Sequence, residues 1–198
     1  MPDLLLIRHG QSTWNAESRW QGQADPQLSE LGERQALAAA PAVVAWGPSR
    51  VVASDLLRAR ATAELLVPAG IAVELEPELR ERDAGEWTGL TRAEIEGAFP
   101  GALAEHRRPA DFESDESLLA RALRTLERLV AGDDDAPVVV VTHGGVVRAV
   151  ERHVRPDLDE GPLPNLGGRR LSHDGAWRLG DRVLLVPDDL PVTTPPPI

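Results

Sequence analysis

The sequence lacks cysteine and lysine, and each absence narrows what the protein can do. Without cysteine there are no disulfides, no thiolate nucleophile and no cysteine-based metal site, so a nucleophile must come from another side chain. Without lysine, all 21 cationic residues are arginine. Arginine is therefore so frequent that a single one is weak evidence for an anion site. Long apolar runs are also missing, because none approaches the roughly 18 residues of a membrane-spanning helix.

Charge and length define the class of protein. The formal net charge is −11. This argues against a nucleic-acid partner, because binding to nucleic acid would require a basic face. A chain of 198 residues can bury a substantial core. We expect one domain over residues 1–190 and a disordered, proline-rich tail at 191–198. Since no basic segment of a secretory signal precedes the first apolar run, we expect a cytoplasmic protein with no membrane partner. The sequence leaves the oligomeric state open.

Two apolar runs lead into a histidine followed by glycine. Residues 4–7 precede Arg8 and His9, and residues 138–142 precede His143. A short apolar run that ends at a glycine is typical of a buried strand followed by a tight turn. Because the carboxyl ends of neighbouring parallel strands meet at one crevice, we expect His9 and His143 to lie together.

Further strand-like runs at 50–53 and 73–76 alternate with helical patterns, which predicts an α/β domain with a largely parallel sheet. Ser54 is predicted to cap a helix over 55–67. Arg58 would then lie near the positive end of the helix dipole, where an anion binds favourably.

Two other segments give weaker signals. Residues 177–186 are predicted to form a hairpin that turns at Gly180 and Asp181. Residues 98–116 are irregular and polar, and they fit an inserted flap over the crevice and a plain surface loop equally well. This segment contains three consecutive basic residues, His106, Arg107 and Arg108.

The residues at the strand ends suit phosphoryl transfer. A neutral imidazole can attack phosphorus directly when its other nitrogen donates a hydrogen bond that fixes the tautomer, so His9 is the candidate nucleophile. The charge on the equatorial oxygens of the transferred group favours planar cationic forks, which Arg8 and Arg58 supply. His143, if protonated beside the phosphate, would add further donors.

An alcohol leaving group also needs a proton, which a positioned carboxylic acid can supply. Glu81, Asp83 and Glu86 lie in one loop after the run at 73–76. We choose Glu81, although the residue types alone do not rank the three.

Five segments, taken in order, resemble those of the histidine phosphatase superfamily, which includes the cofactor-dependent phosphoglycerate mutases. The first is Arg-His-Gly-Gln-Ser-Thr-Trp-Asn at 8–15 and the last is Thr-His-Gly-Gly at 142–145; between them lie 28–36, 54–59 and 79–89. The resemblance spans nearly the whole chain. It implies a three-layer α/β/α sandwich with a mainly parallel mixed sheet, and chemistry without a metal or cofactor.

The resemblance also implies roles for individual residues. His9 would become phosphohistidine, and Glu81 would be the proton donor. The phosphoryl group would be held by Arg8, Asn15, Arg58, His143 and the amide of Gly144.

Departures from the mutases favour the smaller phosphatase branch. The mutases are longer and carry an Arg-His-Tyr-Gly type sequence after the acid, whereas this chain has Arg-Asp-Ala-Gly at 82–85. We therefore expect a phosphomonoester hydrolase that acts on a small phosphorylated metabolite. The basic run His106, Arg107 and Arg108 leaves room for a phosphorylated acid as substrate.

Three other functions are weighed against hydrolysis. A mutase would use the same phosphohistidine with a second alcohol as acceptor. A phospho-ligand binding module would share the fold, but here every chemical group is retained. A histidine metal site is disfavoured, because no His-x-His or His-Glu-x-x-His pair occurs and Arg8 and Arg58 would repel a cation.

Overall fold

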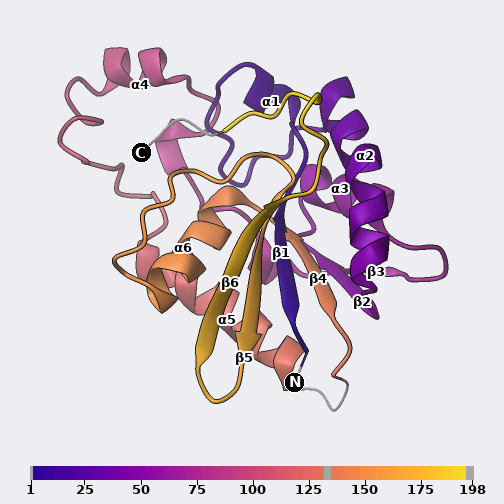
Figure 1. Ribbon diagram of the computed structural model, residues 1–198. Coiled ribbons are helices and arrows are strands. Elements are labelled where there is room, and N and C mark those ends of the chain that lie inside the picture. The colour runs from indigo at the N-terminus through magenta and orange to yellow at the C-terminus, as the bar shows by residue number, and fades with distance from the viewer. Residues whose placement is uncertain (1, 132–134, 195–198) are drawn as a thin grey trace.

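The computed structural model describes residues 2–131 and 135–194. Over these residues, a six-stranded mixed sheet has the order β3-β2-β4-β1-β5-β6 (Figure 1). The first four strands in this order are parallel, and the last two are antiparallel additions at one edge. Their bounds are β1 Leu4–Arg8, β2 Arg50–Ala53, β3 Val73–Leu75, β4 Val138–Thr142, β5 Gly167–His173 and β6 Trp177–Leu184.

Helices cover both faces of the sheet, which completes the expected α/β/α sandwich with its mainly parallel sheet (Figure 1). Leu4 and Leu6 belong to a core cluster with α5 and α6, whereas Leu5 and Ile7 belong to a cluster with α2 and α3. This alternation explains the unbroken apolar run of β1, because a central parallel strand is buried on both faces. The helices are α2 Glu30–Trp46, α3 Leu57–Leu66, α5 Asp115–Val130 and α6 Gly144–Val154.

A third, smaller core cluster lies beside the carboxyl ends of the parallel strands. It joins Trp87 and Phe112 with Trp20 packed against them, and the ring centroids of Trp20 and Trp87 are 5.2 Å apart. Phe112 belongs to the irregular segment at 98–116, so this part of the segment is anchored on the aromatic cluster. The short elements around the cluster are α1 Thr13–Ala16, η1 Pro77–Leu79, η2 Gly85–Trp87 and α4 Arg92–Ala98.

The predicted hairpin turn at Gly180 and Asp181 is wrong. Both residues lie inside the continuous strand β6, and the chain turns at 174–176, where Gly175 has a φ of 89°. The prediction divided this single strand into two, because glycine followed by aspartate is typical of a turn. In the structure Gly180 packs closely on β5, where an added Cβ would lie 2.9 Å from the Cβ of Arg170.

The first residues of the predicted disordered tail contact the protein. Pro191 accepts a hydrogen bond from Gln35 Nε2 at 2.7 Å, and the carbonyl of Thr193 accepts one from the amide of Asn165 at 3.1 Å. Residues 195–198 lie outside the described residues. Within the described ranges, no helix is long and apolar enough to cross a membrane.

Candidate active site

The crevice lies at the carboxyl ends of the central parallel strands. Arg8 pairs in register with Thr142, so the residues that follow them, His9 and His143, leave neighbouring strands at the same level. Their ring centroids are 5.1 Å apart, with an angle of 63° between the ring planes. The structure thus brings together the two histidines that the sequence pairs.

His9 is 3% exposed and its tautomer is fixed locally. Nδ1 lies 2.6 Å from the carbonyl oxygen of Gly10, which can only accept, so Nδ1 carries the proton and Nε2 keeps its lone pair. Burial lowers the pKa of His9 well below its usual value, and the positive charges of Arg58 and Arg8 lower it further. The ring is therefore neutral at physiological pH.

Glycine is required next to His9 because this turn touches α2. A Cβ on Gly10 would lie 2.7 Å from the carbonyl oxygen of Gly32. The amide of Gly10 donates to Thr62 Oγ1 at 3.0 Å, which ties the turn to α3 as well. The orientation of His9 is thus set by two helices.

Arg8 and Arg58 flank His9, and each is anchored by backbone carbonyls. Arg8 Nη1 donates to Leu163 at 2.7 Å, and Arg58 donates through Nη1 to Ala24 and through Nη2 to Gly22. Burial lowers the pKa of each to about 10, which leaves both cationic at neutral pH. Arg58 Nε is buried with no hydrogen-bond partner among the described residues.

Ser54 does not cap α3 as predicted. The helix begins at Leu57 after Leu56, which offers no side-chain cap, and Ser54 Oγ instead lies 2.9 Å from His143 Nε2. His143 is fully buried beside His9, and its Nδ1 has no partner within the described chain. Burial and the charge of Arg58 lower the pKa of His143 well below its usual value. Without a bound anion, the ring is neutral.

The geometry separates the three candidate acids. Glu81 lines the cavity, and its carboxylate accepts from the amide of Arg82 at 2.8 Å and from that of Gly145 at 3.0 Å. Asp83 and Glu86 are exposed and do not line it. A Cβ on Gly145 would come within 2.1 Å of Glu81 Oε1, so glycine at this position leaves room for the acid.

Asn15 and Gly144 also border the cavity. Asn15 Oδ1 accepts a hydrogen bond from the backbone N–H of Ser12 in a capping box. This bond orients the Asn15 side chain and leaves its Nδ2 available to a ligand. Gly144 is the first residue of α6, where helix amides point outward to an anion.

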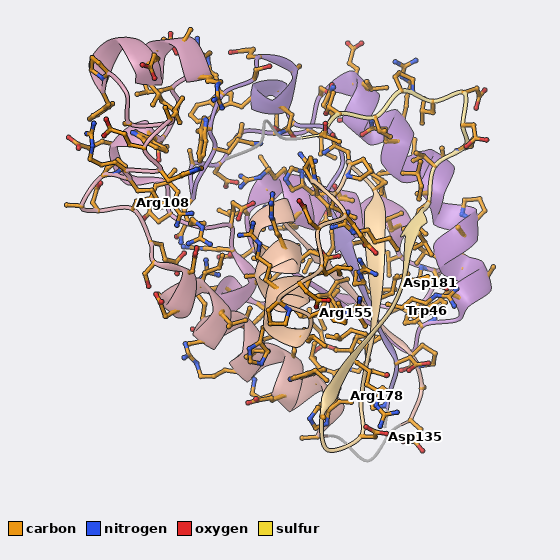
Figure 2. All side chains as sticks on the ribbon, turned by 60° about the vertical axis from the view of Figure 1, so that its left-hand side comes forward. Trp46, Arg108, Asp135, Arg155, Arg178 and Asp181 are labelled. Carbon is orange, nitrogen blue, oxygen red and sulfur yellow. The ribbon has the colours of Figure 1, made fainter. Side chains whose placement is uncertain are left out.

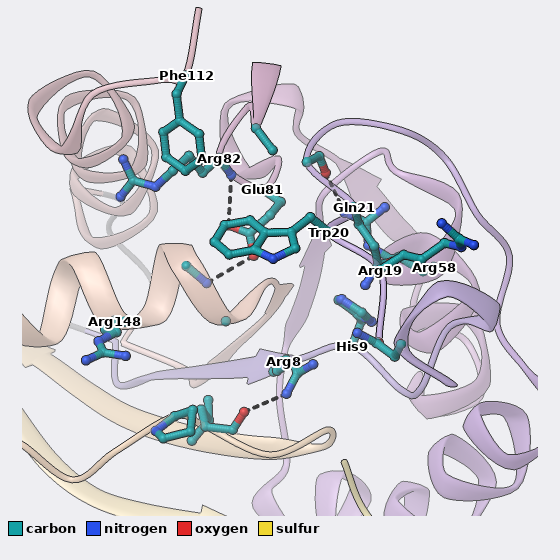
Figure 3. A pocket seen from close by; sticks show the side chains of 17 residues that line it. Arg8, His9, Arg19, Trp20, Gln21, Arg58, Glu81, Arg82, Phe112 and Arg148 are labelled. Atoms are coloured by element: carbon teal, nitrogen blue, oxygen red, sulfur yellow. Dashed lines mark hydrogen bonds between the residues drawn. The ribbon is translucent and has the colours of Figure 1, made fainter. Parts of the chain in front are cut away.

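The cavity has a volume of about 140 Å³ and includes residues that the sequence analysis missed (Figure 3). Several are arginines, whose signal is lost among so many others, and the aromatic ones are reached only through the fold. The missed lining residues include Arg19, Trp20, Gln21, Arg82, Phe112 and Arg148. Of the basic run, His106 and Arg108 border a neighbouring cavity, whereas Arg107 pairs with Glu105.

The described residues contain no group of three or more His, Asp or Glu side chains suited to hold a metal ion. Their polar atoms instead form a site for an anion. The guanidinium groups of Arg8 and Arg58 lie around His9 in the cavity, and the carboxylate of Glu81 also lines it (Figure 3). The ring of His143 packs against that of His9. Among the buried nitrogens that have no partner in the described residues, Arg58 Nε and His143 Nδ1 belong to this group of side chains.

Comparisons with known proteins agree with this chemistry. A family model described as the histidine phosphatase superfamily (branch 1) matches residues 4–171. A glucosyl-3-phosphoglycerate phosphatase of Mycobacterium tuberculosis is 39% identical over 179 residues, 83% of this chain and 80% of the relative. A metal-independent phosphoserine phosphatase of Arabidopsis thaliana is 34% identical over 173 residues, 82% of this chain and 73% of the relative.

Among solved structures, a mycobacterial glucosyl-3-phosphoglycerate phosphatase in complex with VO3 is similar over 91% of this chain and 98% of its own. The TM-score is 0.82 and the sequence identity 37%. A further structure of the mycobacterial phosphatase holds inorganic phosphate and has a TM-score of 0.80.

Proposed function

The chain belongs to branch 1 of the histidine phosphatase superfamily, and we propose that it hydrolyses small phosphomonoesters in two steps through a phosphorylated His9. The observation that carries this proposal is the state of His9. Its ring is neutral, its Nδ1 proton is held by Gly10, and its free Nε2 lies among anion-binding donors. Such an imidazole is ready to attack phosphorus without first losing a proton.

In the first step, His9 Nε2 forms a bond to phosphorus while the bond from phosphorus to the ester oxygen breaks. Arg8, Arg58 and His143 hold the equatorial oxygens, and the negative charge of the bound group favours a proton on His143. Glu81, protonated, gives its proton to the departing oxygen, which leaves as an alcohol. Asn15 and the Gly144 amide add hydrogen bonds to the phosphoryl oxygens.

In the second step, water replaces the alcohol. Glu81, now a carboxylate, takes a proton from the water as the water oxygen attacks phosphorus. The bond from phosphorus to Nε2 breaks, inorganic phosphate leaves, and His9 and Glu81 return to their starting states. No metal ion is required, because the arginines supply the positive charge that a metal would otherwise provide.

Hydrolysis rather than mutase transfer is supported by the relatives. Two relatives that are 33% identical over 78% and 73% of the chain are named as a phosphoglycerate mutase-like protein and a probable phosphoglycerate mutase. Those that are 39% and 34% identical over 83% and 82% of the chain are named as phosphatases of glucosyl-3-phosphoglycerate and of phosphoserine. Both substrates are small phosphomonoesters. We propose that the reaction takes place in the cytoplasm.

The test is phosphate release by the purified protein in the presence of EDTA, with 3-phosphoglycerate and O-phosphoserine in the substrate panel. Wild type should release phosphate and form an acid-labile, base-stable phosphoenzyme, and His9→Ala should lose both. His173→Ala is the matched control, since that ring packs on Trp177 away from the cavity and its loss should leave turnover intact. A phosphoenzyme that persists in His9→Ala would move the nucleophile elsewhere. Transfer between carbons of phosphoglycerate without phosphate release would identify a mutase.

A further inference from the structure

A second cavity, of about 500 Å³, adjoins the catalytic one. We call it the side cavity. Arg82, Gly145 and Arg148 line both, so the two spaces meet along the first turns of α6. Figure 3 shows Arg148 at the opposite end of the catalytic cavity from Arg58. The catalytic reaction uses none of the side cavity's own residues.

Arg148 is the unusual residue at this junction. It is half-buried, yet it forms no hydrogen bond or ion pair with any residue that the structure describes. Burial lowers its pKa, as does the positive charge of Arg152 one turn further along α6, while Asp159 and Glu151 oppose the shift. The Glu151 carboxylate is already held by Arg169 and Arg182. Partial burial of an unpaired cation costs desolvation free energy, which an anionic ligand bound to the guanidinium group would offset.

The other charged groups of the side cavity leave it positive. Arg82 and Arg108 both pair with Asp115, so one carboxylate serves two guanidinium groups. Arg152, like Arg148, has no hydrogen bond or ion pair to the described residues. The remaining titratable lining groups are one acid, Glu116, and two histidines, His106 and His153.

The side cavity also lies where the leaving group must go. Glu81, which would protonate the ester oxygen, is held by the amides of Arg82 and Gly145. Both of those residues line the side cavity. An alcohol held beside Glu81 therefore has Arg82, Gly145 and Arg148 as neighbours, because all three line both cavities.

We propose that Arg148, assisted by Arg152, binds a carboxylate on the alcohol part of the substrate, so that the protein prefers phosphoesters of hydroxy acids. This inference rests on the proposed hydrolysis and assigns its specificity. A planar guanidinium fork matches a carboxylate in geometry as well as charge. Arg148 acts on binding and not on the reacting bonds.

The test compares two pairs of substrates that differ only in the carboxylate. One pair is 3-phosphoglycerate and sn-glycerol 3-phosphate, and the other is O-phosphoserine and O-phosphoethanolamine. Wild type should favour the acid in each pair by kcat/KM. Arg148→Gln should lower that preference about 10- to 100-fold, mostly through KM for the acids, because a charge-assisted hydrogen bond is lost. Arg152→Gln should lower it less, since its side chain is exposed.

Arg178→Gln is the matched control. Arg178 on β6 pairs with Asp174 in the turn that precedes this strand, and neither residue lines either cavity. Figure 2 shows Arg178 near the hairpin end of the molecule. In Arg178→Gln, the preference for the acid in each substrate pair, measured by kcat/KM, should equal that of wild type. A preference that is unchanged in Arg148→Gln, or an equal loss for both members of each pair, would overturn the proposal.

Binding separates this proposal from the hydrolysis itself. Calorimetric titration of each substrate pair into His9→Asn, with and without Arg148→Gln, reads the preference without turnover. Stronger binding of the acids that disappears with Arg148→Gln supports the carboxylate site even where phosphate release fails. Equal binding of acid and non-acid refutes the site even where phosphate release succeeds.

Discussion

His9 and His143 are buried as neutral imidazoles. At low pH both side chains bind a proton in the unfolded state but stay neutral in the folded state. Burial holds the pKa of both well below 6.5 in the folded state. Below about pH 6.5 the unfolded state therefore binds more protons, and the free energy of unfolding falls by up to about 1.4 kcal/mol per pH unit for each histidine. Above that pH the effect vanishes.

This predicts a smaller acid sensitivity in His9→Asn. Urea unfolding between pH 7.5 and 5 should show a slope of stability against pH that is shallower than that of wild type by about 1.4 kcal/mol per pH unit below pH 6.5. Identical slopes in the two proteins would mean that His9 is protonated in the folded state, which would also weaken its role as a nucleophile.

At the residue scale, the sequence predicts the reacting groups better than the walls of the cavity. His9 and His143 follow apolar strands, so their position in space follows from the sheet. The residue types alone did not rank Glu81 above Asp83 and Glu86; the family resemblance favoured Glu81, and among the three only Glu81 lines the cavity. Arg148 could not be predicted, because its importance lies in having no partner, and the sequence does not reveal partners.

At the scale of elements, the first turn of α6 holds the proposed acid in place, because the amide of Gly145 donates to the carboxylate of Glu81. Gly145→Ala should push Glu81 aside, because the new Cβ would lie 2.1 Å from Oε1. Hydrolysis of alkyl phosphates, which need a proton on the leaving oxygen, should fall about 10- to 100-fold, whereas p-nitrophenyl phosphate should lose far less. Initial rates on both ester types measure this difference. Gly97→Ala in α4, where a Cβ meets nothing within 4 Å, is the control and should lose neither. Equal losses on both esters would place the proton donor elsewhere.

Elements with strong local signals were predicted well, and those that depend on distant partners were not. The apolar runs at 4–7 and 138–142 lie in β1 and β4 as predicted. Ser54 has the residue type of a helix cap, yet its hydroxyl is engaged by His143, which is 89 positions away. β5 begins with two glycines and has almost no strand signal of its own. It is held by β1 and β6, which sequence periodicity does not show.

At the scale of the whole molecule, the last described residues lie against the carboxyl end of β1, beside the candidate active site. Arg8 Nη1 donates to the carbonyl of Thr193 at 3.1 Å, across 185 positions of sequence. Thr193 also hydrogen bonds to the side chain of Asn165, whose Nδ2 donates to the backbone carbonyl of His9 at 2.9 Å. A segment that composition assigns to disorder thus supports both Arg8 and the backbone of His9, the proposed nucleophile.

Removal of this support should weaken phosphate binding in general. A variant that ends at Leu190 loses the Thr193 contacts, while Arg8 keeps its bond to Leu163. We expect KM to rise about 3- to 10-fold for every ester, acid or not, since one hydrogen bond to a charged group is lost. Inhibition by inorganic phosphate should weaken by the same factor. The control ends at Thr194 and retains every contact named above. Unchanged KM in the shorter variant would show that Leu163 alone holds Arg8, whereas a loss confined to acids would place the tail at the side cavity.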